Sequence, residues 1–517
     1  MGAVAAIALI VYLKTLAPTI TWAHDGADGG DLITAVVTGG VPHPTGYPTY
    51  LVLGRLFLLV PWGDQARRMN LMSAVFAALT AGLLYLIVLC TFRLFRDGRV
   101  ALRERLIAAA GALAFAFSPL LWSQALIAEV YTLNALFVAL TIALVLLWIE
   151  GRGRGFLVAA GFVYGLGLGN HLTLFLAGPA IVLLVLLLRR RLPPCGLRQA
   201  PVVVPAFLLG LSVYVALPLR AVHHPPVNWG DPRTLDRFLW LVSGRLYRRY
   251  FFSLPLRYLP SRLSAWAGLL VDQFGWWGVF PALVGMWRVW RKSRGFALFS
   301  LALLLAYSTY AIGYDTTDSK VYLIPAFLVV ALWLAWGLEH LLTELSRLLA
   351  PADSRFIQAL SLCVLVIIPL LSLWGNFSSL DVSSEQEARD YGLEVLETVA
   401  PGALIVTQTD AHTFTLNYFR YAEEMRLDVA LLDGHLLYNE WYRRHLPHIH
   451  PRVDLPENVF RLFGGGAECV PSLLVTTIDV NWQHRPTYLT DPDAEIRACY
   501  TLSQEGSVYR VVGYRES

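Results

Sequence analysis

Long apolar runs are the feature that most limits how this chain can fold. Segments rich in Leu, Val, Ala and Phe recur along it with almost no charge. They lie at 3–19, 69–92, 106–122, 126–149, 155–170, 171–188, 200–219, 263–287, 295–313, 321–345 and 356–375. A helix of roughly 20 such residues crosses about 30 Å of hydrocarbon. The runs predict an all-α polytopic membrane domain of about eleven transmembrane helices.

Composition agrees with a membrane protein. The 517 residues are 56% hydrophobic and 15% charged, where a soluble chain would carry about 25% charge. The first run lacks a basic n-region and an A-x-A-like site, so we interpret it as a retained span rather than a signal peptide. The net charge of +4 is small and gives no indication of nucleic-acid binding.

Arginines mark every second connection between the runs. They are concentrated in 93–105, 151–154, 189–198, 287–295 and 346–355. The positive-inside rule assigns such connections to the cytoplasm. We therefore expect a cytoplasmic N-terminus in a bacterial plasma membrane or an ER-type membrane, with loops 21–68 and 220–262 outside. Segment 47–61 is apolar but short and flanked by proline, which favours an interfacial or re-entrant helix.

Composition changes to that of a soluble domain after Asn376. Alternating and helical patterns predict an extracytoplasmic α/β domain over 377–517, following a transmembrane domain over 1–376. Strands are expected at 403–410, 426–433, 472–478 and 507–514, and helices at 411–425 and 436–446. Cys469 and Cys499 would face an oxidising compartment, where a disulfide and two buried free thiols are both open alternatives.

The first external loop, "TWAHDGADGGDLITAVVTGGVPHPTGYPTY", concentrates polar residues behind an apolar run. Asp28 and Asp31 would share one face of a short helix beginning near Gly29. A carboxylate held at the membrane surface can act as general base toward an acceptor hydroxyl. The alternative is that Asp28 only caps the helix and that the other aspartates are solvated.

Further polar residues are expected on the same side of the membrane. Glu129 and Tyr131 begin an apolar run, where a carboxylate is costly unless it has a partner. His171 follows the glycine-rich turn "GLGLGN". Asp410 and His412 end a predicted strand of the soluble domain and are candidates for acceptor contacts. Each of these has a plain structural alternative as a turn, cap or helix-start residue.

Cations are scarce outside, so those present are candidates for binding a lipid phosphate. Arg220, Arg245 and Lys320 are the cations we select, although an arginine at a helix end can also serve as an interfacial anchor. Asp315 and Asp318 precede Lys320 in "GYDTTDSK", which is also consistent with a solvated turn. The chain has no Walker loop, dinucleotide fingerprint or nucleophile elbow in a supporting context, and its five cysteines lack zinc spacing.

Several blocks resemble one membrane family in the same order. "DGADGGDLITAVVTGGVPHPTGYPTY" is similar to the "GDSGELI…HPPGYP" signature of a family long catalogued as a domain of unknown function, whose animal member is a transmembrane protein O-mannosyltransferase. "LWSQALIAEVYTLNALF", "GLGLGNHLTL", "YDTTDSKVYLIPAF" and "VTQTDAHTFTLNYFRYAEEMRLDVALLDGHLL" resemble its later blocks. The resemblance covers all but about the last 60 residues.

The resemblance implies the GT-C fold and a membrane glycosyltransferase that uses a polyprenyl-phosphate sugar, with mannose favoured. The family's acidic signature falls on Asp28 and Asp31, with Gly29 in place of serine and Asp31 in place of glutamate, so which one is the base stays open. The family's proline- and histidine-containing turn falls on His43 to Pro48.

The implied roles follow from this match. Asp28 would be the inverting base and Asp31 would orient it, while a further set would bind the donor. That set is His43, Tyr47, Glu129, Tyr131, His171, Arg220, Arg245 and Lys320. No cofactor is called for, although three aspartates in one loop are a set that a divalent metal could use. The partners would be the lipid-linked sugar, membrane lipids and a protein or glycan acceptor.

Two other functions remain as alternatives. Broken helices and intramembrane carboxylates also occur in transporters and flippases. A membrane-anchored glycan-binding protein would use the external domain alone. The absence of an internal repeat argues against the first alternative, and the number of spans argues against the second.

Overall fold

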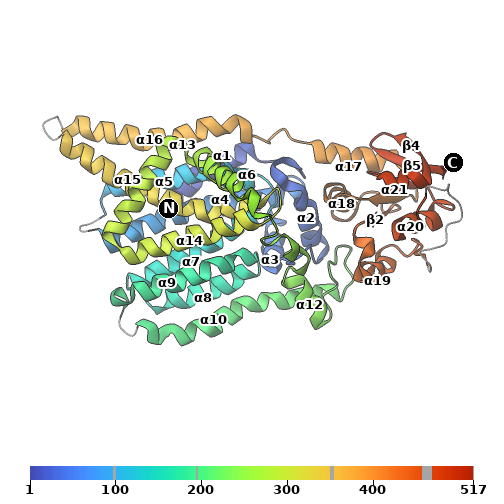
Figure 1. Cartoon of the computed structure of the whole chain (residues 1–517), viewed down its shortest axis with the longest axis horizontal. Helices are drawn as coiled ribbons and strands as arrows, with labels where there is room; N and C mark the ends of the chain where they lie inside the picture. The colour runs from blue at the N-terminus through green and yellow to red at the C-terminus, as the bar shows by residue number, and fades with distance from the viewer. Residues whose placement is uncertain (97–99, 194–195, 350–353, 457–468, 516–517) are drawn as a thin grey trace.

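A computed structural model describes residues 1–517 except 97–99, 194–195, 350–353, 457–468 and 516–517. The molecule is elongated, with a large helical body and a smaller sheet region at one end (Figure 1). The helices of the body are α1 (Gly2–Thr15), α2 (Gly29–Thr38), α3 (Pro48–Phe57), α4 (Gln65–Phe95), α5 (Leu102–Ala116), α6 (Pro119–Ala125), α7 (Tyr131–Ile149), α8 (Arg154–Leu168), α9 (Ala177–Leu187), α10 (Val203–Leu211), α11 (Ala216–Ala221), α12 (Leu235–Val242), α13 (Leu259–Lys292), α14 (Arg294–Gly313), α15 (Ile324–Leu348) and α16 (Ser354–Leu380).

The helical body belongs to a multi-pass membrane protein. Among the described residues, seven helices are long and apolar enough to cross a membrane, or eight if the bent pair α5–α6 is one span. Shorter apolar helices at Gly2–Thr15, Arg154–Leu168 and Leu172–Leu187 coincide with three more of the expected runs. The total of eleven spans stays a prediction, because helix length alone does not establish these three as spans.

One expected span is broken. The run 106–122 was predicted as a single helix, but α5 ends at Ala116 and α6 turns away by 66°. Pro119 begins α6, and proline both lacks the amide hydrogen that would continue the preceding helix and disfavours helical geometry at Ser118. Gln273 of α13 accepts the amide hydrogen of Leu120 at 2.9 Å, which satisfies the newly exposed helix start.

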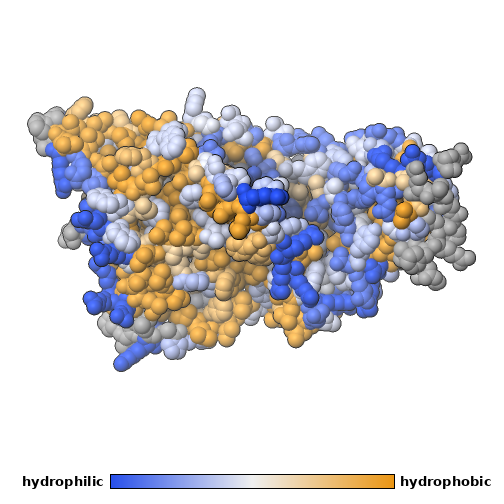
Figure 2. All heavy atoms as spheres, viewed as in Figure 1, coloured by the Kyte–Doolittle hydropathy of each residue, from blue (hydrophilic) through white to orange (hydrophobic). Residues whose placement is uncertain are grey.

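The surface of the helical body is apolar, whereas hydrophilic residues dominate the sheet region (Figure 2). Exposed side chains on α13 include Trp276, Phe280 and Leu283. Inside the body, α13 and α15 approach so closely that a Cβ on Gly285 would lie 1.7 Å from the carbonyl oxygen of Trp333. Glycines allow this contact between membrane helices, where packing rather than hydrophobicity drives association.

The sheet region has five strands in the order β2-β1-β3-β5-β4. β1 (Leu404–Thr407) pairs in parallel with β2 (Ala430–Asp433) and β3 (Thr487–Leu489), while β5 (Val508–Tyr514) is antiparallel to β3 and β4 (Tyr500–Glu505). Its helices are α17 (Glu387–Thr398), α18 (Asp410–Asn417), α19 (Glu440–Ile449), α20 (Leu473–Trp482) and α21 (Ala494–Cys499). Cys469 and Cys499 form a disulfide, which decides between the two alternatives for these residues.

The strand expected at 472–478 is wrong, because this segment begins α20. Its buried run "LLVTTI" is rich in β-branched residues and too short for its period to be decisive. Ser472 provides the helix start, since its hydroxyl accepts the amide hydrogen of Val475 at 3.2 Å. Serine is a preferred residue at helix N-caps, so Ser472 was the feature of the sequence that indicated a helix here.

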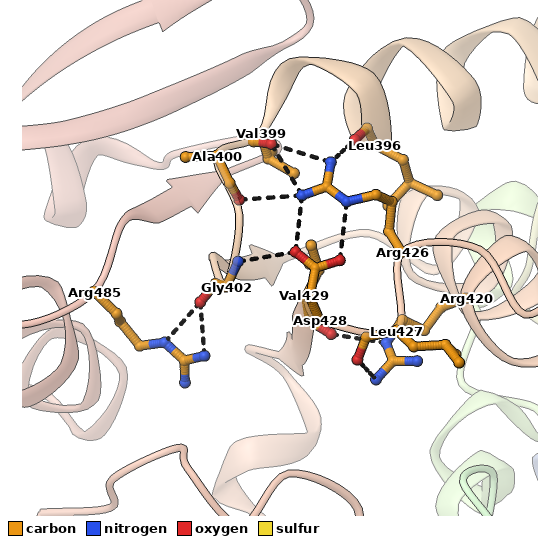
Figure 3. Close-up of polar contacts among 10 residues, drawn as sticks. All are labelled: Leu396, Val399, Ala400, Gly402, Arg420, Arg426, Leu427, Asp428, Val429 and Arg485. Carbon is orange, nitrogen blue, oxygen red and sulfur yellow. Dashed lines mark hydrogen bonds and ion pairs between the residues drawn. The ribbon is translucent and has the colours of Figure 1, made fainter.

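Arg426 joins α17 to the segment that leads into β2 (Figure 3). Its guanidinium group donates to carbonyl oxygens at the end of α17, which lack partners within the helix. These belong to Leu396, Val399 and Ala400. The same group pairs with Asp428 at 3.0 Å, and Asp428 accepts the amide hydrogen of Gly402 at 2.9 Å. The contacts fix the end of α17 to the segments that lead into β1 and β2.

Helix α18 of the sheet region packs directly on α2 of the helical body. A Cβ on Gly30 would lie 2.4 Å from the carbonyl oxygen of Phe414, so the two backbones touch. The indole of Trp22 donates to the hydroxyl of Thr415 at 3.0 Å. The sheet region therefore covers the loop between α1 and α3.

Candidate active site

A cavity of about 310 Å³ lies between the loop that joins α1 to α3, the ends of several membrane helices and the start of α18. Its lining combines three carboxylates, two histidines and seven tyrosines. These are Asp28, Asp318, Asp410, His43, His171, Tyr47, Tyr131, Tyr247, Tyr250, Tyr310, Tyr314 and Tyr322. Carboxylates that accept hydrogen bonds and aromatic rings that stack are suited to a polyhydroxylated ligand. Arginine and lysine are not found among the described residues that line the cavity.

Asp28 presents its carboxylate to this cavity. It immediately precedes α2, which begins at Gly29 as expected, yet its side chain makes no capping hydrogen bond. The side chain is 41% exposed. Enclosure by protein raises the pKa of Asp28 to about 6; His43 opposes the shift, and Asp410 and Asp31 add to it. An ionised Asp28 is therefore a base with a pKa near neutral pH.

Asp31 is buried and fully occupied. One carboxylate oxygen of Asp31 accepts two hydrogen bonds from His43. The backbone amide donates the first at 2.8 Å, and ring Nδ1 donates the second at 2.7 Å. The other oxygen accepts the indole hydrogen of Trp229 at 3.1 Å. With every contact directed inward, Asp31 orients His43 and has no face toward the cavity.

His43 lies between the two aspartates. Its Nε2 is 3.6 Å from the carboxylate of Asp28, on the opposite side of the ring from Asp31. Burial alone would lower the pKa of His43, but the charges of Asp28 and Asp31 and the hydrogen bond to Asp31 outweigh it and raise the pKa to about 9. The imidazolium is thus the cation among the residues that line the cavity.

Three other expected residues meet at one wall of the cavity. The ring centroids of Tyr131 and His171 are 5.7 Å apart, and those of Tyr47 and His171 are 6.2 Å apart. The hydroxyl of Thr173 lies 2.8 Å from Nδ1 of His171. Burial lowers the pKa of His171 to about 4, so this histidine is neutral.

Glu129 lies behind the cavity rather than in its lining. Its side chain accepts the amide hydrogen of Val130 at 3.3 Å and the residue is 3% exposed. Burial, followed by the charge of Asp28, raises the pKa of Glu129 well above its usual range. The Glu129 carboxyl group therefore contacts the turn between α6 and α7 from inside the protein.

The three cations expected at the site do not line the cavity. Arg220 donates to the carbonyl of Gly40 at 3.3 Å, and Arg245 is exposed. Lys320 pairs with Asp25 of the first loop at 3.1 Å. We expected the cations of the external loops to converge on a lipid phosphate. Instead, the short segment Arg245–Tyr250 contributes Tyr247 and Tyr250 to the cavity lining.

The sequence analysis did not single out five of the seven tyrosines that line the cavity, namely Tyr247, Tyr250, Tyr310, Tyr314 and Tyr322. Tyr310, Tyr314 and Tyr322 lie on neighbouring segments around the turn between α14 and α15, with Tyr314 and Tyr322 centroids 5.4 Å apart. The recurrence of tyrosine at the external ends of predicted spans was the available signal, but interfacial tyrosine is also a general membrane feature.

An apolar groove of about 780 Å³ adjoins the cavity. Leu172, Thr173, Phe251 and Tyr310 line both. Beyond them the groove is lined by residues such as Phe175 and Leu305, from helices on the lipid-facing surface. A lipid chain in this groove would place its polar end at the cavity.

Across the parts of the chain that the structure describes, no three His, Cys, Asp or Glu side chains are grouped so as to hold a metal ion.

Comparison with known proteins gives relatives over most of the chain. Residues 28–193 match the N-terminal domain of the protein O-mannosyl-transferase TMEM260. The protein O-mannosyl-transferase TMEM260 of Mus musculus is 31% identical over 481 residues, covering 87% of this chain and 65% of that protein. The protein O-mannosyl-transferase tmem260 of Dictyostelium discoideum is 22% identical, covering 98% of this chain and 66% of that protein. The chain thus spans slightly less than two thirds of each relative.

Solved structures share the fold. ArnT from Cupriavidus metallidurans matches with a TM-score of 0.54 and 14% identity, covering 88% of this chain and 95% of that one. The archaeal oligosaccharyltransferase AglB from Archaeoglobus fulgidus, in complex with an inhibitory peptide and a dolichol-phosphate, matches with a TM-score of 0.51 and 12% identity. That match covers 82% of this chain and 63% of AglB.

Proposed function

We propose that the chain is a membrane glycosyltransferase that moves a sugar from polyprenyl phosphate to a hydroxyl acceptor, because it is similar to protein O-mannosyl-transferases and shares the fold of ArnT and AglB. The observation that carries the proposal is the arrangement of Asp28, His43 and Asp31 beside a cavity that adjoins an apolar groove. The names of the relatives favour mannose as the sugar and a protein hydroxyl as the acceptor.

Asp28 is the base in this mechanism. The acceptor oxygen attacks C1 of the sugar while its proton passes to the Asp28 carboxylate. The bond between C1 and the phosphate oxygen breaks, and its electron pair leaves with the polyprenyl phosphate. A single displacement of this kind inverts the configuration at C1. Asp31 cannot take this role because its oxygens are already occupied by His43 and Trp229.

The donor enters from the lipid side. Its polyprenyl chain lies in the groove beside Phe175 and Leu305, with the phosphate near the shared boundary at Thr173. The leaving phosphate gains negative charge, which the His43 imidazolium and tyrosine hydroxyls stabilise. Tyr131 and His171 contact the sugar, and neutral His171 is both donor and acceptor of hydrogen bonds.

We further propose that the site is extracytoplasmic and that transfer needs no metal. The disulfide between Cys469 and Cys499 supports an oxidising compartment for the sheet region, which covers the cavity. Transfer that persists in EDTA would agree with the metal-free mechanism, whereas loss in EDTA and recovery with a divalent cation would refute it.

The direct test of function is turnover by the purified full chain. Polyprenyl-phosphate mannose and a threonine-containing peptide are supplied in detergent or nanodiscs, and the released lipid phosphate and glycopeptide are measured by mass spectrometry. We expect both products in equal amounts. Transfer of the intact lipid-linked sugar across a vesicle bilayer, without cleavage, would instead establish a flippase.

A further inference from the structure

We infer that Asp410 binds the acceptor polypeptide by accepting a hydrogen bond from a backbone amide next to the reacting serine or threonine. This rests on the proposed function and assigns the sheet region a part in the site. Asp410 is the residue of that region, within the described chain, that lines the cavity. All the other lining residues come from the helical body and its loops.

Rigid packing holds Asp410 in place. It begins α18, whose first turn is capped by the hydroxyl of Thr409 through the amide hydrogen of His412 at 3.4 Å. The hydroxyls of Thr407 and Thr413 lie 2.6 Å apart and tie the helix to the end of β1. Because α18 touches α2 at Gly30, the backbone of α18, which carries Asp410, is held against the helical body.

The carboxylate of Asp410 has unused hydrogen-bonding capacity. Over the described residues, its oxygens make no hydrogen bond or ion pair, and the residue is exposed. Enclosure raises the pKa of Asp410, opposed by His43 and strengthened by Asp31. Because the Asp410 carboxylate is exposed at the cavity and has no protein partner among the described residues, its oxygens can accept a hydrogen bond from a bound ligand.

The donor sugar-lipid is the less suitable source of that hydrogen bond. The apolar groove meets the cavity at Leu172, Thr173, Phe251 and Tyr310, and Asp410 is not part of this boundary. An anionic phosphate would also be repelled by Asp410. A peptide backbone supplies neutral N–H donors from the aqueous side, and its neighbouring hydroxyl would then face Asp28.

The test separates acceptor binding from sugar chemistry. Using the full chain, polyprenyl-phosphate mannose and the threonine peptide above, transfer kinetics are compared for the wild type, Asp410→Asn and Asp390→Asn. Asp390 is the matched control, since its side chain is 69% exposed on α17 and outside the cavity. We expect Asp410→Asn to raise the peptide KM about tenfold, as for loss of a hydrogen bond to a charged group, with no change in the KM of the donor. Asp390→Asn should change neither.

A second readout uses water as the acceptor. Slow hydrolysis of the donor without peptide gives a transfer-to-hydrolysis ratio, which Asp410→Asn should lower at least fivefold. An unchanged peptide KM, or a rise in the donor KM, would overturn the assignment of Asp410 while leaving the glycosyltransferase proposal intact. If the wild type cleaves no lipid-linked sugar, the proposed function fails and this inference fails with it.

Discussion

At the scale of single residues, the site separates two aspartates that the sequence presents as near equivalents. Spacing predicted that Asp28 and Asp31 share one face of a short helix; the helix begins at Gly29 as expected, but Asp28 precedes it and lines the cavity, whereas Asp31 does not. The spacing of the two aspartates gave no information on their hydrogen bonds, because the partners of Asp31, His43 and Trp229, lie 12 and 198 residues away in the sequence. These long-range contacts occupy both oxygens of Asp31 and leave the carboxylate of Asp28 for the role of base that we propose.

The pH dependence of transfer follows from this pair. Activity should rise as pH increases through about 6, where Asp28 loses its proton and becomes a base. It should fall as pH increases through about 9, where the His43 imidazolium loses its charge. The two limits belong to the coupled pair, and initial rates at saturating donor between pH 5 and 10 measure them.

Asp31→Asn provides the internal check on the alkaline limit. Removing that carboxylate removes a charge and a hydrogen bond that both raise the pKa of His43, so the upper limit should move below 9. The control is Asp25→Asn, because Asp25 is paired with Lys320 at the surface. A flat profile across this range, or no shift in Asp31→Asn, would contradict the roles given to these residues.

At the scale of elements, the apolar runs located the helices well but not their interruptions. Pro119 lies at the bend between α5 and α6. Gly275 has non-helical dihedral angles inside α13. Hydropathy averages over about 20 residues and is insensitive to a single break. The strand wrongly expected at 472–478 has a different cause, because a short buried run does not show the period by which a helix is distinguished from a strand.

The close contact of α13 and α15 predicts a stability effect. Gly337→Val should destabilise the protein by about 1–3 kcal/mol, because its Cβ would lie 1.8 Å from the carbonyl oxygen of Pro281 and the helices must separate. Thermal unfolding in detergent, followed by tryptophan fluorescence, measures the loss. Gly268→Ala in α13 is the control, since a Cβ there meets nothing within 4 Å. Equal midpoints for Gly337→Val and the wild type would contradict the close packing.

The Arg426 contacts predict a local effect in the sheet region. Arg426→Ala should destabilise this region by about 2 kcal/mol, because several carbonyls and Asp428 lose a charged donor. Proteolysis of the full chain in increasing urea would detect earlier cleavage between α17 and β2. Arg444→Ala should have little effect, since the ion pair of Arg444 with Glu440 is highly exposed. Equal protease sensitivity of the two variants would count against the role of Arg426.

At the scale of the whole molecule, the sheet region forms part of the site rather than an appendage. The sequence predicted a membrane domain and a soluble one and named Asp410 as a candidate for acceptor contacts, but it did not indicate that α18 would pack on α2. Contacts between distant segments depend on shape complementarity that a linear pattern does not record. For the same reason the sequence did not predict that tyrosines from several segments line the cavity, or that Arg220, Arg245 and Lys320 lie outside its lining.

The proposed orientation can be measured in intact cells. In a Cys363→Ser background, Glu397→Cys on α17 should react with a membrane-impermeant maleimide, because the sheet region is expected outside. Arg190→Cys, in an arginine-rich connection, should react only after permeabilisation. Both replaced residues are exposed, and Cys363 is removed because it is an exposed free thiol. The reversed labelling pattern would place the cavity on the cytoplasmic side.

In the proposed mechanism Asp28 is the base for displacement of a lipid-linked sugar. Its most direct test compares initial rates of polyprenyl-phosphate mannose turnover for the wild type, Asp28→Asn and the surface control Asp25→Asn, with peptide present. We expect Asp28→Asn to lose about 10²–10⁴-fold in rate, with wild-type turnover in Asp25→Asn and inverted configuration at C1 of the product. Turnover by Asp28→Asn within about twofold of the wild type, or retained configuration at C1, would contradict the account.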